Sequence, residues 1–265
     1  MARGIAKVKY ERQSGNVSVV DQPNWEFIYT TSTVKDPDWN IGDRVVLPDG
    51  REFRYAKSAG VCASGQSVDF VHTGAIPYTL FSAAAAIGDT SVSFVASTHT
   101  ALAKDELKGG FFISWPAADY DQFRGIIGND ASATDAAITI YLDGPLTVAL
   151  TAAMAGEAYQ NPYSSVQESS NLTLGKGGVP AVYVSAANMY FWLQTKGPVF
   201  IAPQSTMTAS KEAVGANFRH DGSLEAVATA LAVTVATNDT TQYAGYRMIG
   251  SYTGNGPLFM LLGCG

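Results

Sequence analysis

The three histidines are the first residues to consider as metal ligands or general bases. His72, His99 and His220 are far apart, and none has another histidine or a cysteine within four residues. Zinc sites use three or four clustered ligands, usually with short characteristic spacings. The sequence therefore predicts no metal site, and we expect each histidine to be a surface residue or a hydrogen-bonded loop residue.

Two cysteines and one glycine-rich segment are the next candidates for chemistry. Cys62 and Cys264 are far apart and belong to no metal-ligand spacing, so we expect reduced thiols and no disulfide framework. No Gly-x-Ser-x-Gly nucleophile motif occurs in the chain. Residues 174–178 contain Gly-Lys-Gly-Gly but not the phosphate-loop pattern, and no helix is expected after them, so they indicate a flexible loop.

Paired acids could support glycoside hydrolysis, which needs two carboxylates across a cleft. Asp119 and Asp121 flank Tyr120, and Asp105 precedes Glu106. Sequence spacing alone does not establish a facing pair, and acids in β-loops are usually solvated. We therefore expect that the protein is not an enzyme and binds no cofactor. A polysaccharide-cleaving enzyme is kept as a third hypothesis.

The elements that would position any such residues are mostly strands. Apolar residues alternate with polar ones at Ile138, Ile140 and Leu142, which is typical of a strand with one buried face. Pro48-Asp49-Gly50 predicts a tight hairpin between two such runs. Further strands are expected at 91–94, 111–115, 123–127, 182–185, 190–194, 199–201, 230–236, 246–249 and 258–262.

Helical signals are few. Residues 101–108 combine good helix formers with a Gly-Gly stop, which predicts one short helix. The alanine-rich stretch 147–159 favours a strand because of its β-branched residues, and Gly197-Pro198 predicts a turn. The fold class is therefore all-β, with β-barrel or β-sandwich units, an extended N-terminal arm and at most one or two short helices.

Composition shifts suggest four zones. Residues 1–26 form an N-terminal arm and residues 27–165 a first β domain. The polar residues 166–178 are a possible linker, and residues 179–265 form a second β domain. Whether the strands form one barrel or two stacked ones stays open.

Charge is scarce and unevenly distributed. Charged residues make up 15% of the chain, against roughly 25% in an average soluble domain, which favours burial between subunits. The net charge is −6, which argues against nucleic acid as a partner. The first 12 residues nevertheless carry +3, and this basic arm is predicted to dock on an acidic protein surface through Arg3, Lys7, Lys9 and Arg12.

The first residues lack the apolar core of a secretory signal, and no stretch approaches the roughly 20 apolar residues needed to cross a bilayer. We therefore expect no membrane partner.

Aromatic residues are the strongest feature of the composition. The chain has 4 Trp, 13 Tyr and 12 Phe. Exposed rings can cover a protein interface or stack on sugars, and we favour the interface. The candidate interface rings are Trp25, Trp39, Trp115 and Trp192.

Several segments together resemble the head decoration, or cement, proteins of tailed bacteriophages. They span about residues 40–200 and comprise Gly42-Asp43-Arg44 with Asp49 to Ala56, Ile87 to Val92, Ile138 to Tyr163, and Tyr190 to Pro198. The resemblance implies a virion structural protein on the outer capsid surface, present in the host cytoplasm during assembly. It also implies a homo-oligomer, specifically a homotrimer, that clamps neighbouring major capsid protein subunits. The resemblance implies no active-site residues in this chain.

A second hypothesis is a carbohydrate-binding module of a phage fibre or tail component. A position elsewhere in the virion, such as the tail tube or neck, is also compatible with a β-barrel.

Overall fold

The computed structural model describes residues 25–71, 75–96, 99–115, 122–169, 174–202, 215–219, 221–226, 242–247 and 258–261. The protein is all-β. Within these residues the helical elements are two 3-10 turns, η1 (Trp25–Tyr29) and η2 (Pro162–Ser164). The predicted arm, residues 1–26, lies almost wholly outside the described residues.

Six strands form one curled antiparallel sheet, which we call the inserted unit (residues 75–159). The order is β4-β9-β6-β7-β8-β5, and a bridge between Phe81 and Phe94 brings the two edge strands together. Its core contains Phe81, Phe94 and Phe112, whose ring centroids lie 5.3–6.2 Å apart. The strands are β4 (Ile76–Leu80), β5 (Ser91–Phe94), β6 (Phe111–Ser114), β7 (Gln122–Asn129), β8 (Ile138–Leu142) and β9 (Ala155–Tyr159).

The remaining strands form a ten-stranded sheet, which we call the main unit (described residues 25–71 and 160–261). Its order is β10-β3-β11-β12-β16-β15-β13-β14, with β2 and β1 branching from β12. A parallel bridge between Ser58 and Val166 joins β10 to the end of β2 and curls this part of the sheet. The strands are β1 (Arg44–Val46), β2 (Glu52–Lys57), β3 (Val68–Phe70), β10 (Val166–Glu168), β11 (Lys176–Pro180), β12 (Tyr190–Phe200), β13 (Gly215–Phe218), β14 (Leu224–Ala226), β15 (Tyr243–Arg247) and β16 (Leu258–Leu261).

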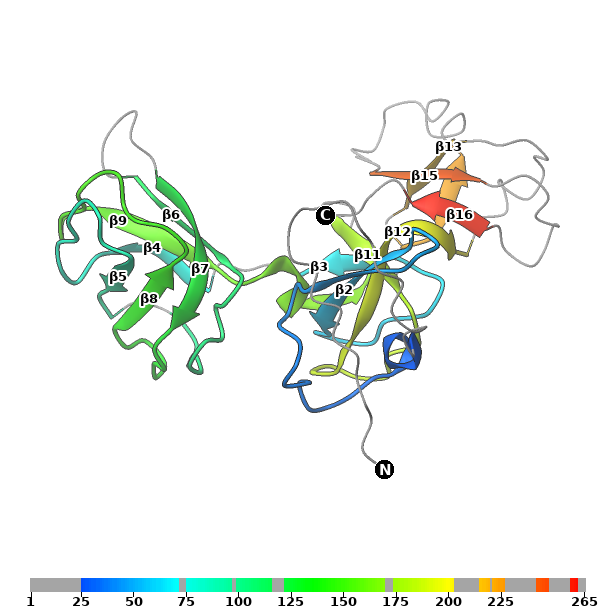
Figure 1. The fold of residues 1–265 in the computed structure, drawn as a ribbon, viewed down its shortest axis with the longest axis horizontal. Helices are drawn as coiled ribbons and strands as arrows, with labels where there is room; N and C mark the ends of the chain where they lie inside the picture. The colour runs from blue at the N-terminus through cyan, green and yellow to red at the C-terminus, as the bar shows by residue number, and fades with distance from the viewer. Residues whose placement is uncertain are drawn as a thin grey trace.

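Figure 1 shows the two units side by side, joined by a narrow connection. The inserted unit lies between β3 and β10 in the sequence, and these two strands pair with each other. The strands therefore group differently from the predicted division into 27–165 and 179–265. The expected linker, 166–178, contains β10 and the start of β11, because both strands complete the sheet around β3.

The hairpin at Pro48-Asp49-Gly50 is confirmed. It joins β1 to β2, and Gly50 has a φ of +86°, which a residue with a side chain rarely adopts. The strands expected at 91–94, 111–115, 123–127 and 138–142 are also present, with shifts of one or two residues at their ends. In the alanine-rich stretch 147–159, β9 forms over the last five residues. The run 230–236 lies outside the described residues.

The helix predicted at 101–108 is absent. Asp105 has a φ of +61°, which interrupts a right-handed helix. The side chain of Asn129 accepts a hydrogen bond from the Leu107 amide at 2.8 Å and donates to the Ala103 carbonyl at 2.9 Å. These contacts with β7 replace helical hydrogen bonds, so the segment forms successive turns.

The turn predicted at Gly197-Pro198 is also wrong, because β12 continues through it. Gly197 has a φ of +87°, and the pairing register with β2 shifts between Gln194 and Lys196. This irregularity changes the strand's partner without ending it. Residues 190–196 pair with β2, whereas residues 197–200 pair with β16.

Candidate functional site

Three of the four candidate tryptophans pack inside the main unit. Trp192 is 2% exposed and lies edge-on to Trp39, with ring centroids 5.0 Å apart. Phe27 stacks on Trp39 at 5.8 Å, and Trp25 packs against the same cluster. Trp192 is therefore a core residue and not an interface residue, and Trp25 and Trp39 are half-buried against it.

Trp115 is different, since it lies on the outer side of the inserted unit. Its side chain is 39% exposed, and its ring lies 5.9 Å from that of Tyr78, which is 67% exposed. Phe111 and Phe123 stack nearby at 5.4 Å with an interplanar angle of 17°. We call this surface the aromatic face; its members are Tyr78, Phe111, Trp115, Phe123 and Ile127.

Strand alternation explains why these rings face outward. On β6, Phe112 and Ser114 are buried, so Phe111 and Ile113 lie on the opposite side of the sheet. Ile113 pairs with Phe123 on β7, which places their side chains on the same face. The members of the aromatic face thus lie on β4, at the end of β6 and on β7, on the outer side of the sheet, with β9 between β4 and β6.

Several residues named from the sequence lie outside the described residues. They are the basic candidates Arg3, Lys7, Lys9 and Arg12, the acids Asp119 and Asp121, the histidines His72 and His220, and Cys264.

His99 is a hydrogen-bonded loop residue, as expected. Its Nδ1 lies 2.6 Å from the Thr100 carbonyl oxygen and its Nε2 lies 2.8 Å from that of Ala136. Both ring nitrogens are therefore occupied by backbone oxygens. Among the residues that the structure describes, no group of three or more His, Cys, Asp or Glu could hold a metal ion.

Cys62 is buried and forms no disulfide. Burial raises the pKa of its thiol to about 12, and the negative charge of Glu168 adds to the increase. A thiol that stays protonated at neutral pH is a poor nucleophile.

A buried ion pair joins two neighbouring strands of the main unit. The Nζ of Lys176 on β11 lies 2.6 Å from Oδ1 of Asp69 on β3, and both side chains are at most 4% exposed. Ser169 donates to the same carboxylate at 2.9 Å and contacts the Lys176 ammonium group. Lys176 is thus part of a strand, and its ammonium group forms an ion pair with the Asp69 carboxylate. The sequence had indicated a flexible loop here.

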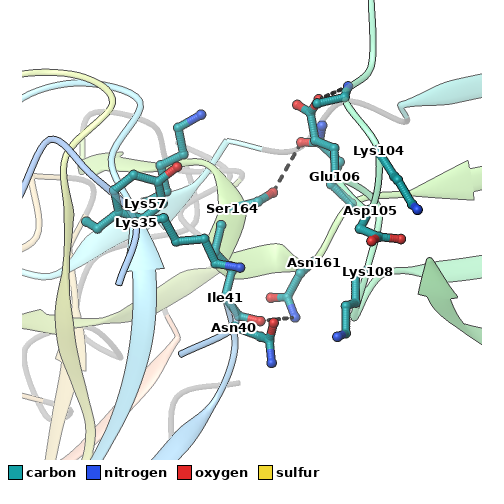
Figure 2. A pocket seen from close by; sticks show the side chains of 13 residues that line it. Lys35, Asn40, Ile41, Lys57, Lys104, Asp105, Glu106, Lys108, Asn161 and Ser164 are labelled. Carbon is teal, nitrogen blue, oxygen red and sulfur yellow. Dashed lines mark hydrogen bonds between the residues drawn. The ribbon is translucent and has the colours of Figure 1, made fainter. Parts of the chain in front are cut away.

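A recess lies between the two units and was not anticipated from the sequence. Its volume is about 390 Å³. Figure 2 shows Lys35 and Lys57 of the main unit on one side and Lys104 and Lys108 of the inserted unit on the other. We call this recess the inter-unit cleft. Its polar lining also includes Asn40, Asp105, Glu106, Gln160, Asn161, Ser164 and Tyr190.

Asn161 joins the two sides of this cleft. Its side-chain nitrogen donates to the carbonyl oxygens of Ile41 at 3.2 Å and Gly109 at 3.0 Å. Its Oδ1 accepts from the Tyr163 amide at 3.0 Å and caps η2. One side chain therefore links the main unit, the inserted unit and the segment that connects them.

Comparison with known proteins adds no assignment: no family model, no curated protein and no solved structure matches this chain. None of the helices in the described part of the chain is long and apolar enough to span a bilayer.

Proposed function

We propose that this chain is a structural protein of a bacteriophage virion that decorates the outer capsid surface and clamps neighbouring major capsid protein subunits. In this proposal it acts as a homotrimer, has no catalytic role and needs no cofactor. It reaches the capsid in the host cytoplasm during assembly. The resemblance of its hairpin segments to phage cement proteins supports the assignment.

The observation that carries the proposal is the aromatic face. Phe123 is 61% exposed and stacks on Phe111, and Ile127 on the same strand as Phe123 is 56% exposed. Adjacent exposed apolar side chains usually mark an interaction surface, and aromatic residues are enriched in protein interfaces. A protein surface that covers these rings would remove their apolar area from water.

The two-unit architecture suits a clamp. Each unit has its own hydrophobic core, and the inserted unit lies in the sequence between β3 and β10 of the main unit. Two separate bodies in one chain can rest on two neighbouring subunits. Many such copies on a shell would turn modest individual contacts into strong overall attachment.

The proposal is tested by co-sedimentation with capsid particles that lack the protein. The Phe111→Ser/Phe123→Ser variant should bind at least about 30-fold more weakly, as expected when interface hot spots are lost. The control is Tyr183→Ser, which removes a 54% exposed ring on the main unit. Unchanged capsid binding by the double variant, with a melting temperature near that of the unaltered protein, would refute docking through this face.

A carbohydrate-binding module is the second candidate, and the Tyr78–Trp115 pair favours it. The two rings lie 5.9 Å apart at an interplanar angle of 32°, and both are exposed. A sugar ring could stack on such a surface. A glycan array separates the two functions, because specific sugar binding lost in Trp115→Ala would support this candidate and count against the capsid role.

A further inference from the structure

The inter-unit cleft is lined by positively charged side chains, although the net charge of the whole chain is −6. Four lysines line it, two from each unit (Figure 2). None of them belongs to an ion pair between described residues; those pairs involve other cations, namely Arg44, Arg51, Lys176, Lys196 and Arg219. The cleft therefore has cationic groups available to an incoming anion.

In the described part of the chain, the two acids in the lining form no ion pair with these lysines, so four positive and two negative groups give the lining an excess of positive charge. The Glu106 carboxylate accepts a hydrogen bond from the Ala103 amide at 2.7 Å. The Asp105 carboxylate lies against Gly128 of β7, where an added Cβ would be 2.5 Å from its Oδ1. Both acids are engaged with the inserted unit itself.

We propose that the inter-unit cleft binds an acidic polypeptide segment, whose carboxylates pair with Lys35, Lys57, Lys104 and Lys108. The cleft volume of about 390 Å³ is roughly that of a dozen water molecules, which is too large for one inorganic anion and fits a few residues of a peptide. This inference does not depend on the proposed capsid role.

The lining favours a peptide over nucleic acid. Asn40, Gln160 and Asn161 offer side-chain amides, and Ser164 a hydroxyl, which match the donors and acceptors of a peptide backbone. Among the described residues, those that line the cleft include no arginine and one aromatic ring, that of Tyr190. Single-stranded nucleic acids usually require several stacking rings along a basic groove.

The test measures binding of a fluorescent octaglutamate peptide to the full chain by fluorescence anisotropy at low ionic strength. Octaglutamine, inorganic phosphate and an oligodeoxynucleotide are the comparison ligands. We expect octaglutamate to bind most tightly and its affinity to fall with added salt. Each Lys→Gln change should weaken binding about two- to fivefold, and the quadruple variant more than about tenfold.

The control variant is Lys196→Gln, since Lys196 is an exposed lysine outside the cleft. Binding of octaglutamate should also slow acetylation of the four cleft lysines in the unaltered protein, but not of Lys196. Three results would overturn the proposal: tighter binding of the oligodeoxynucleotide, equal binding by the quadruple variant and Lys196→Gln, or no binding of octaglutamate.

Discussion

The side-chain nitrogen of Asn161 lies 3.0 Å from the carbonyl oxygen of Gly109, so a residue that follows β9 holds the turn that precedes β6. The same nitrogen donates to Ile41 of the main unit. Because the two units have separate cores, contacts of this kind define their relative position more than apolar packing does. The inter-unit cleft depends on that position.

Replacing Asn161 by Asp should loosen the contact between the units. The carboxylate can still accept the hydrogen bond from Tyr163, but it cannot donate to Ile41 or Gly109. We expect faster proteolysis of the connecting segment and a wider distribution of distances in small-angle X-ray scattering. Asn161→Ala also removes the cap and should cost a further 0.5–2 kcal/mol, about the value of an N-cap. Unchanged scattering in Asn161→Asp would contradict this role.

Gly42 should tolerate a side chain less well than Gly50. Both have a positive φ, +88° and +86°, so alanine costs about 1–2 kcal/mol of backbone strain at either position. An added Cβ on Gly42 would lie 2.3 Å from the Asn161 side-chain nitrogen, whereas Gly50 has open space around it. Gly42→Ala should therefore lower the free energy of unfolding by about 1–3 kcal/mol more than Gly50→Ala. Equal effects in urea denaturation would refute the steric argument.

Breaking the Lys176–Asp69 pair should be strongly destabilising. Both groups are buried, so Lys176→Met leaves a carboxylate with one partner fewer in a medium that solvates charge poorly. We expect a loss of about 3–5 kcal/mol in the free energy of unfolding. The double variant Lys176→Met/Asp69→Leu should lose less than the sum of the two single changes. Additive losses would show that the two groups are not coupled.

Cys62 should resist thiol reagents in the folded protein. Burial raises the pKa of its thiol to about 12, so the thiolate is scarce at the pH of ordinary labelling. In a Cys264→Ser background, intact-mass measurement after iodoacetamide should show no label in the native state and one label in urea. Native labelling at the rate of an exposed cysteine would contradict its burial.

The same shift predicts how stability changes with pH. The folded thiol holds its proton up to about pH 12, whereas the unfolded thiol loses it near its ordinary pKa of 9.0. The unfolded state therefore binds fewer protons between these values, and stability falls as pH rises through them. Cys62→Ala should show a shallower fall over that range.

Deleting residues 1–20 should leave a folded protein that no longer binds capsids. The deletion removes Arg3, Lys7, Lys9 and Arg12, and with them the positive charge of the predicted arm. Circular dichroism checks the fold and co-sedimentation checks binding. Full capsid occupancy by the truncated protein would refute a docking role for the arm.

Local patterns in the sequence were enough to predict the all-β class and many of its strands. Alternation at Ile138, Ile140 and Leu142 and the hairpin at Pro48-Asp49-Gly50 depend on neighbouring residues, whose conformational preferences act over a few positions. The abundance of aromatic residues also predicted that some of their rings would be exposed at an interface. The sequence did not show which rings these would be.

Long-range contacts decided the rest. Asn129 prevents a helix at 101–108 by bonding to its backbone, and Gly197 lets β12 change partners where a turn was expected. Alternation shows that a strand has two faces but not which face a distant strand will cover, so Trp192 and Trp115 could not be told apart. The cleft lysines come from two distant parts of the sequence, Lys35 and Lys57 in one and Lys104 and Lys108 in the other. They meet only because the inserted unit lies against the main unit, a contact that no local preference encodes.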